Sequence, residues 1–367
     1  MFDPFSLAMP GVVSLNPYEP GKPEEELKRE LNLDKIIKLA SNENPLGCCD
    51  SAIAVLHQCN SIARYPDGSA FRLKQALAKK LSIPPSQLTI GNGSNDILEL
   101  LVKAFVCSND AVVISQHAFA VYYLACKAVD AEIDIIPARN WGHDLGAMLA
   151  ACKRNTKNGN IKMVFIANPN NPTGTYLSRD SIEQFLRQLP QHIIAVIDEA
   201  YYEYVTADDY SSALEFLNEF PNLVITRTFS KVYGLAGLRI GYGISSDQIA
   251  DLLNRVRQPF NANTVAQNAA IEALDDDAFV NRSIELNSQQ KQLFYQRFND
   301  LGLDYIMSQG NFVCVHVADE PGVYQKMLKQ GVIVRPVGNY QMPGWLRFTI
   351  GLANENQQAL AALEKSL

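Results

Sequence analysis

Several features are absent from this 367-residue sequence, and each absence excludes a class of protein. No apolar run approaches the roughly 20 residues that a transmembrane helix needs, so a membrane-spanning protein is not expected. No long run of Lys or Arg is present and the net charge is −7, which argues against nucleic acid as a partner. Residues 1–11 lack a basic region followed by an apolar core, so we expect no signal peptide.

Histidine and cysteine are sparse and unpatterned, which argues against a metal site or a disulfide framework. None of the five histidines has metal-ligand spacing; they are His57, His117, His143, His192 and His316. The cysteines are odd in number and lack zinc-ribbon spacing; they are Cys48, Cys49, Cys59, Cys107, Cys126, Cys152 and Cys314. We expect reduced thiols, a reducing compartment and therefore a cytoplasmic location.

What is present is the composition of a globular protein, with 47% hydrophobic and 19% charged residues. A chain of this length suits one large domain plus a smaller one. Residues 1–39 have the character of an N-terminal arm, because prolines interrupt regular structure before a helical stretch over residues 24–31.

Strand-like and helix-like segments alternate from residue 87 onward. Short runs rich in Val and Ile predict strands that are covered on both faces, and the segments between them have helical periodicity, as over residues 95–105. This alternation predicts an α/β domain over residues 40–260, with a mainly parallel seven-stranded sheet wrapped by helices. The predicted strands are residues 87–91, 111–115, 132–136, 162–167, 193–198, 223–228 and 239–243.

The pattern of predicted strands and helices changes after about residue 260. A long helical stretch over residues 275–301 precedes an alternating strand at 311–317. Two further strands are predicted at residues 332–336 and 346–351, interleaved with helices. We therefore expect a smaller α+β domain over residues 261–367.

Polar clusters follow four of the predicted strands, at residues 93–96, 168–174, 198–201 and 229–231. In open α/β sheets, ligands bind beyond the carboxyl ends of the strands. One such cluster is compatible with an ordinary turn. Four in the same position relative to their strands indicate one site assembled from several loops.

Two ionisable residues in these clusters are candidates for chemistry. A lysine after a serine is by itself usually a solvated side chain, but Lys231 follows a buried strand and precedes an apolar, Gly-rich segment. Such surroundings lower the pKa of an ammonium group and make the amine a nucleophile towards aldehydes. Asp198 ends an apolar run; it is either a helix N-cap or the partner of a buried positive group, and a pyridinium nitrogen matches it well.

Other residues of the clusters offer hydrogen-bond donors. Gly-Ser-Asn-Asp at 93–96 opens a helix, and such a start is either a plain N-cap or a phosphate site. Ser230 and Arg239 offer further donors to an anion. Asn171 belongs to an Asn-Pro-Gly turn, and its amide, like the Tyr201 hydroxyl, is suited to a phenolate oxygen.

Together these residues resemble the fold type I aminotransferases that depend on pyridoxal phosphate (PLP). The resemblance covers nearly the whole chain. Its most specific parts, which stand in the family's order, are Ser-Lys-Val-Tyr-Gly-Leu-Ala-Gly-Leu-Arg (230–239), Asn-Pro-Asn-Asn-Pro-Thr-Gly (168–174) and Asp-Glu-Ala-Tyr (198–201).

The resemblance implies a role for each residue. Lys231 would carry PLP as a Schiff base and move a proton, and Asp198 would pair with the pyridine nitrogen. Asn171 and Tyr201 would bond the ring oxygen, and Phe119, a tyrosine in many relatives, would stack on the ring. The residues around the phosphate would be Ser94, Asn95, Ser230 and Arg239.

A narrower resemblance is to the histidinol-phosphate aminotransferases within that family. It is carried by Asn-Pro-Tyr-Glu-Pro-Gly (16–21), Leu-Ala-Ser-Asn-Glu-Asn-Pro-Leu-Gly (39–47), Arg-Tyr-Pro-Asp (64–67) and the segment 334–351. Tyr65 of the third motif would reach the cofactor phosphate of the other subunit. This implies a homodimer with shared sites. The N-terminal arm would contribute both to the dimer contact and to the smaller domain.

The same resemblance assigns residues to the substrate. Arg335 and Arg347 would hold an anionic tail, which is a carboxylate in glutamate and a phosphate in histidinol phosphate. A surface salt bridge is the other interpretation of Arg335. Tyr18 and Glu43 would line the end of the pocket that holds the substrate side chain.

The implied reaction is ping-pong, with glutamate and imidazole-acetol phosphate exchanged for 2-oxoglutarate and histidinol phosphate. Aromatic amino acid transamination and decarboxylation of a phosphorylated amino acid remain alternatives, because they share Lys231, Asp198 and Arg239. A PLP-sensing regulator that binds DNA is a remote alternative, since the arm is too short and proline-rich for a helix-turn-helix domain.

Overall fold

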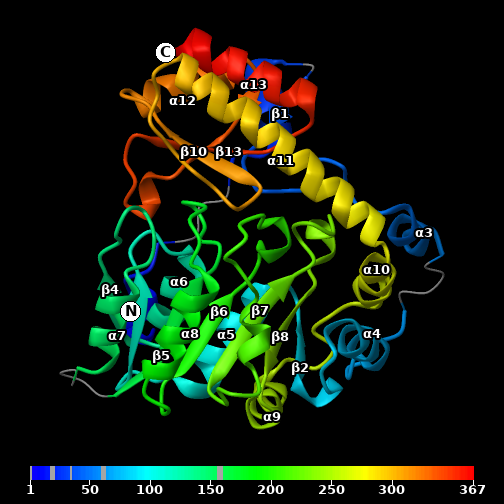
Figure 1. Ribbon diagram of the computed structural model, residues 1–367, viewed down its shortest axis with the longest axis vertical. Helices are drawn as coiled ribbons and strands as arrows, with labels where there is room; N and C mark the ends of the chain where they lie inside the picture. Colours follow the sequence, from blue (N-terminus) through cyan, green and yellow to red (C-terminus); the bar gives the residue numbers. More distant parts are fainter. Residues whose placement is uncertain (1, 17–20, 34, 59–62, 155–159) are drawn as a thin grey trace.

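Two sheets of unequal size organise the chain in the computed structural model, which describes residues 2–16, 21–33, 35–58, 63–154 and 160–367 (Figure 1). The larger sheet has the strand order β2-β8-β7-β6-β5-β3-β4. All neighbouring pairs are parallel except those made by β8, which is antiparallel to β2 and β7. Its strands are β2 (Leu88–Gly91), β3 (Ala111–Ser115), β4 (Glu132–Ile136), β5 (Ile161–Ala167), β6 (Ile194–Asp198), β7 (Leu223–Thr228) and β8 (Gly241–Ser245).

Helices cover both faces of this sheet, because alternate side chains of each strand point to opposite sides. In β5, Met163 and Phe165 belong to one core cluster, and Val164 and Ile166 to the other. The first face is covered by α5 (Ser94–Phe105), α6 (Ala120–Ala128) and α9 (Asp247–Val256). The second is covered by α3 (Asp50–Gln58), α4 (Phe71–Leu81), α7 (Leu145–Cys152), α8 (Arg179–Gln188) and α10 (Thr264–Asp275).

The predicted mainly parallel seven-stranded sheet is therefore present, and β3, β4 and β7 have the predicted bounds. The prediction was wrong for the start of β8, which was expected at Arg239. Arg239 has a left-handed backbone (φ 54°), so the turn after β7 is still in progress there. The strand begins two residues later, at Gly241, where extended backbone resumes.

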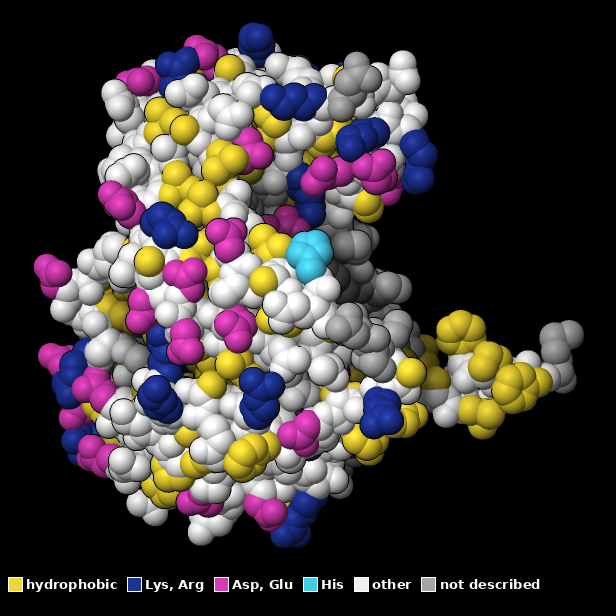
Figure 2. Space-filling view, turned by 90° about the vertical axis from the view of Figure 1, so that its right-hand side faces the viewer, with side chains coloured by type: hydrophobic (Ala, Val, Ile, Leu, Met, Phe, Trp, Pro, Cys, Tyr) yellow, Lys and Arg dark blue, Asp and Glu magenta, His cyan; other side chains and the backbone are white. Residues whose placement is uncertain are grey.

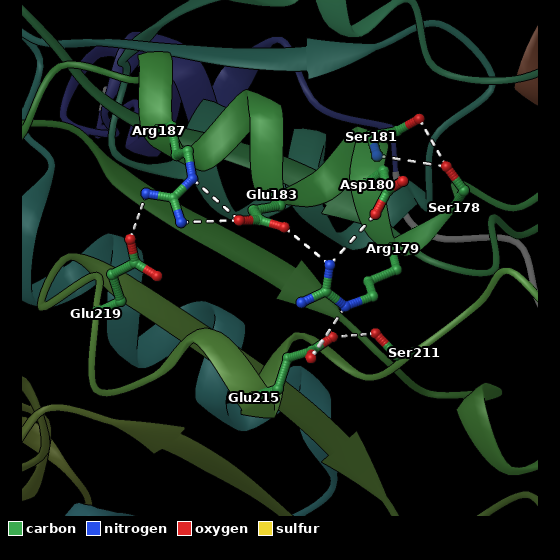
Figure 3. A network of polar contacts seen from close by, with 9 residues as sticks. All are labelled: Ser178, Arg179, Asp180, Ser181, Glu183, Arg187, Ser211, Glu215 and Glu219. Atoms are coloured by element: carbon green, nitrogen blue, oxygen red, sulfur yellow. Dashed lines mark hydrogen bonds and ion pairs between the residues drawn. The ribbon is translucent and has the colours of Figure 1, made fainter.

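A surface network of charges joins α8 to the short helix η4 (Ala213–Phe216) (Figure 3). Arg179 contacts Asp180, Glu183 and Glu215, and Arg187 contacts Glu183 and Glu219. Each of these side chains is substantially exposed to solvent except Glu183. Exposed ion pairs contribute little stability, so we expect this network to add little to the free energy of unfolding.

The smaller part contains a four-stranded sheet with the order β12-β13-β10-β9 and a parallel pair, β1 with β11. The strands are β1 (Ile37–Lys38), β9 (Tyr305–Ile306), β10 (Phe312–His316), β11 (Val332–Ile333), β12 (Arg335–Pro336) and β13 (Trp345–Thr349). The helices are α2 (Glu24–Leu31), α11 (Asp277–Asp300), α12 (Glu320–Lys329) and α13 (Ala353–Ser366). No helix among the described residues is long and apolar enough to cross a membrane.

The single strand predicted at residues 332–336 is instead two short strands in different sheets. Val332 and Ile333 pair with β1, whereas Arg335 and Pro336 pair with β13. Proline has no backbone N–H to donate, which limits how far β12 extends. The break turns Arg335 towards β13 and therefore towards Arg347, its partner in register.

The long helix α11 spans both parts of the molecule (Figure 1). Phe279, near its start, belongs to the core cluster of the large sheet, whereas Phe294 and Phe298 belong to the core of the small domain. The preceding helix α10 packs on α3 and α4 of the large part. We therefore propose a domain boundary within α11 rather than after residue 260.

Candidate active site

The four predicted polar clusters meet in one cavity between the two parts of the molecule. Loops after β2, β5, β6 and β7 form its floor, and residues 21 and 40–42 with the small domain close it from the other side. The predicted site residues that line it are Ser94, Asn95, Phe119, Asn171, Asp198, Tyr201, Ser230, Lys231, Arg239, Arg335 and Arg347. The register of the sheet thus brings together residues far apart in sequence.

Lys231 follows β7 and reaches into the cavity. Its Nζ donates to the Ser41 carbonyl at 3.1 Å and lies 5.7 Å from the centroid of the Tyr201 ring. Burial, followed by the charge of Arg347, lowers the pKa of Lys231 from its ordinary 10.5 to about 8, although Glu43 and Asp198 act in the opposite direction. A substantial fraction of the amine is therefore unprotonated and nucleophilic near neutral pH.

Asp198 is the last residue of β6 and is buried. Its carboxylate accepts hydrogen bonds from the hydroxyls of Tyr122 at 2.6 Å and Thr226 at 2.9 Å. Burial raises the pKa of Asp198, and these hydrogen bonds oppose the rise. The alternation of side chains along β6 directs Asp198 to the α6 face and Glu199 to the opposite face, where Glu199 pairs with Arg227 at 2.9 Å.

Tyr201 and Asn171 lie side by side on the cavity wall. The Tyr201 hydroxyl accepts from the Asn171 amide at 3.1 Å and from the Asn42 amide at 2.9 Å. Burial raises the pKa of Tyr201 to about 12, so its hydroxyl keeps its proton and can donate it in a hydrogen bond. The two side chains therefore present neutral donors to an oxygen in the cavity.

The start of α5 forms one anion subsite. Gly93 has a positive φ of 85°, and a Cβ there would lie 2.4 Å from the Arg239 guanidinium, so only glycine permits this approach. Arg239 is an exposed side chain at the rim that donates to Ser230 Oγ at 3.3 Å. None of the ion pairs among the described residues joins Arg239 to a carboxylate. A helix N-terminus, hydroxyls and a guanidinium together suit a phosphate.

A second anion subsite lies across the cavity, on the small domain. Arg335 of β12 and Arg347 of β13 are paired in register and buried. Arg347 donates to the Asn171 side chain at 2.5 Å and to the Ala40 carbonyl at 2.8 Å, and its buried Nε has no hydrogen-bond partner among the described atoms. A buried guanidinium with an unsatisfied N–H indicates a ligand with acceptor oxygens.

A family model settles the relationship of the chain to known proteins. The model for aminotransferase class I and II matches residues 34–363. The chain belongs to this aminotransferase family. Two relatives named histidinol-phosphate aminotransferase, from Pseudomonas fluorescens (strain Pf0-1) and Methylobacillus flagellatus, are each 51% identical, covering 99% of this chain and 98% of theirs.

A solved structure supports the same assignment. The histidinol-phosphate aminotransferase from Sinorhizobium meliloti, in complex with pyridoxal-5'-phosphate, superposes with a TM-score of 0.88 at 28% identity. It covers 97% of this chain and 96% of its own. The predicted fold type I aminotransferase architecture is confirmed.

Two described residues that the aminotransferase resemblance assigned, Tyr65 and Glu43, do not line the cavity of this single chain. Tyr65 is 82% exposed and stacks on Phe260 at 4.6 Å. Glu43 is half-exposed and pairs with Lys38 at 3.0 Å, so its carboxylate acts on the cavity through its charge. Tyr18 lies outside the described residues. The roles assigned to these three residues stay predictions.

Sequence reasoning missed three residues of the aminotransferase site. Tyr122 and Thr226 hold the Asp198 carboxylate, and Asn42 holds the Tyr201 hydroxyl. Asn42 was within reach, because it lies in the motif at 39–47. Tyr122 is one helical turn beyond Phe119, but the sequence of its helix is that of a buried helix. Nothing in that sequence indicates a polar role for Tyr122.

Proposed function

We propose that this aminotransferase uses PLP and interconverts histidinol phosphate plus 2-oxoglutarate and imidazole-acetol phosphate plus glutamate. The observation that carries the proposal is that two anion subsites, one at the start of α5 and one at Arg335 and Arg347, line the same cavity as Lys231. A phosphorylated cofactor and an anionic substrate occupy such a cavity together. The names of the relatives favour histidinol phosphate as the substrate.

The residues present fit the cofactor. The start of α5 with Arg239 offers donors to its phosphate, Phe119 offers a flat face to its ring, and Asp198 offers a buried carboxylate to its ring nitrogen. When bound, PLP supplies a protonated ring that withdraws electrons from the reacting carbon of the substrate. The unsatisfied Arg347 Nε remains for the substrate.

Each side chain of the site has its own role in the reaction. Lys231 would hold the cofactor, and its amine would move a proton between the substrate carbon and the cofactor. Arg335 and Arg347 orient the substrate by its anionic tail, first for glutamate and then for the phosphate ester. Tyr201 and Asn171 donate hydrogen bonds to the ring oxygen. 2-Oxoglutarate leaves before the second substrate enters.

Single-turnover kinetics test the substrate. The PLP-loaded protein is mixed with histidinol phosphate in one cell and phenylalanine in another, and loss of the visible absorbance is followed. We expect conversion by histidinol phosphate at a much lower concentration, because Arg335 and Arg347 bind its phosphate. Preference for phenylalanine would leave the proposed PLP-dependent amino transfer in place, but it would assign the protein to the aromatic amino acid aminotransferases.

Arg335→Met is expected to raise the KM for histidinol phosphate by about 10- to 100-fold, since hydrogen bonds to charged groups contribute about 1.5–3 kcal/mol. Steady-state kinetics measure the change. Arg335→Lys is the matched control, which keeps the charge but loses the planar donor pair, and we expect an intermediate KM. An unchanged KM in Arg335→Met would exclude this arginine from the substrate subsite.

The rate at which the apoprotein captures PLP is expected to rise with pH and to level off above about 8, the pKa of Lys231. The reason is that only the unprotonated amine attacks the aldehyde, and its fraction is one half at the pKa and approaches one above it. Stopped-flow absorbance measures the profile over about two pH units on either side of that pKa. A capture rate that keeps rising towards the ordinary lysine pKa would show that the amine is not desolvated.

We propose that the active unit is a homodimer. Large apolar side chains of the N-terminal segment are exposed, among them Phe2, Phe5 and Leu7, and Figure 2 shows a projecting segment on which such side chains gather. Exposed apolar clusters of this kind mark protein contacts. Tyr65 and Phe260 form a second exposed aromatic pair, suited to reach a neighbouring subunit.

Subunit complementation tests whether Tyr65 serves the partner's site. Tyr65→Ala and Lys231→Ala are each expected to impair activity, and co-expression of the two variants is expected to restore part of it. The mixed dimer then contains one site with both an intact Lys231 and an intact Tyr65. Restoration would be absent if Tyr65 acted within its own subunit.

We propose a cytoplasmic location. The six cysteines that the structure describes are all free, and four of them are buried. Reduced thiols are the rule in reducing compartments.

A further inference from the structure

Tyr122 lies directly beside Asp198, on a helix that the motifs of the sequence do not mark. It is in the first turn of α6, and its ring is fully buried. The Tyr122 hydroxyl donates to Asp198 Oδ2 at 2.6 Å, while Thr226 donates to Oδ1 at 2.9 Å. Each carboxylate oxygen thus accepts from a fixed side-chain donor, and the Ala200 backbone also bonds the carboxylate, which sets the orientation of the group towards the cavity.

The ring of Tyr122 is itself held on two sides. It stacks on Phe165 of β5 with a centroid distance of 4.9 Å and an interplanar angle of 11°. Its other contact is edge-to-face with Phe119, at 5.8 Å and 82°. One side chain therefore supports both the residue suited to the face of the cofactor ring and the carboxylate suited to its nitrogen.

The electrostatics around Asp198 explain why a neutral donor is useful there. Burial and the neighbouring Glu199 both favour the uncharged carboxyl of Asp198. Hydrogen bonds from Tyr122 and Thr226 favour the charged form. The phenol keeps its own proton, because burial and Asp198 raise the pKa of Tyr122. A cation in its place would instead compete with the ring nitrogen for the carboxylate.

We propose that Tyr122 is a positioning residue that keeps Asp198 ionised and aimed at the cavity, so that the ring nitrogen of the cofactor stays protonated. The proposal rests on the proposed use of PLP. Tyr122 borders the cavity, but its hydroxyl is committed to Asp198, through which we infer that it acts.

Cofactor binding by apoprotein variants tests this role. Tyr122→Phe keeps the packing on Phe165 and Phe119 and removes only the hydroxyl. We expect its dissociation constant for PLP to rise about 10- to 100-fold, the range for a lost hydrogen bond to a charged group. Its affinity for an analogue with a carbon in place of the ring nitrogen is expected to stay close to that of the wild type. Turnover should fall while the KM for histidinol phosphate stays unchanged.

Two further variants complete the test. Tyr295→Phe is the matched control, because its buried hydroxyl bonds Ser308 far from the cavity, and we expect wild-type values for both ligands. Thr226→Val removes the donor from the other oxygen of Asp198 and is expected to behave as Tyr122→Phe does. It also keeps the test available if the latter variant fails to fold.

Two results would overturn the inference. The first is equal affinity of wild type and Tyr122→Phe for PLP; the second is the same loss of affinity for PLP and for the analogue, which indicates a structural role alone. In both cases the wild type still binds PLP and the proposed function stands. Wild-type protein that binds no PLP would instead remove the proposed function and this inference together.

Discussion

Lys231→Ala is expected to lower the rate of amino transfer on the order of 10⁴-fold, because it removes both the nucleophile and the group that moves the proton. The other strong bases that line the cavity are arginines, which stay protonated and cannot replace it. Single-turnover conversion of histidinol phosphate by PLP-loaded protein measures the loss.

Lys291 provides a matched control for this variant. Lys291 is also buried, and burial also lowers its pKa to about 8. It belongs to α11, does not line the cavity, and donates from Nζ to the Ser308 carbonyl at 2.9 Å. Lys291→Met is expected to retain turnover near the wild-type value. If both lysine variants lost activity equally, or neither did, desolvation alone would not identify the reactive amine.

Arg227→Met is expected to destabilise the apoprotein by about 3–5 kcal/mol, the usual result of removing one partner from a buried ion pair. Glu199 is 1% exposed and Arg227 is 2% exposed. Arg227 also donates to Ser212 and lies 3.7 Å from the centroid of the Tyr202 ring. Without the guanidinium, the Glu199 carboxylate stays buried without its cation. Urea denaturation followed by circular dichroism measures the loss.

The surface network in Figure 3 supplies the control for this prediction. Arg187→Met breaks two ion pairs on α8, yet we expect a change below about 1 kcal/mol, since water screens exposed pairs. The double variant Glu199→Leu with Arg227→Met is expected to recover much of the lost stability, because no unpaired charge remains. Equal losses at Arg187 and Arg227 would contradict the account of the buried pair.

The large sheet was predictable because its strands are short Val- and Ile-rich runs buried on both faces. The predicted strand bounds were wrong at two places where the backbone conformation determines where a strand begins or breaks. The left-handed conformation of Arg239 delays β8, and the change of partner after Ile333 divides one expected strand into β11 and β12. Neither event has a signature in hydrophobic periodicity.

Some residues of the candidate site were likewise predictable from the sequence, and others were not. Lys231, Asp198 and Asn171 were recognisable because unusual residue types follow buried strands in sequence. Tyr122 and Thr226 were not, since a tyrosine in a helix and a threonine in a strand are ordinary core residues until side-chain directions are known. Tyr65 does not line the cavity of its own chain, and its role at the site of a partner subunit stays a prediction.

The central claim, that Lys231 carries the cofactor, has a direct chemical test. The PLP-loaded protein is reduced with borohydride, which fixes the cofactor on its lysine, and is then digested and analysed by mass spectrometry. We predict a pyridoxyl group on the peptide that contains Lys231, and no such group in the Lys231→Ala variant. A modified Lys291 or a surface lysine, with Lys231 unmodified, would contradict the assignment and the function built on it.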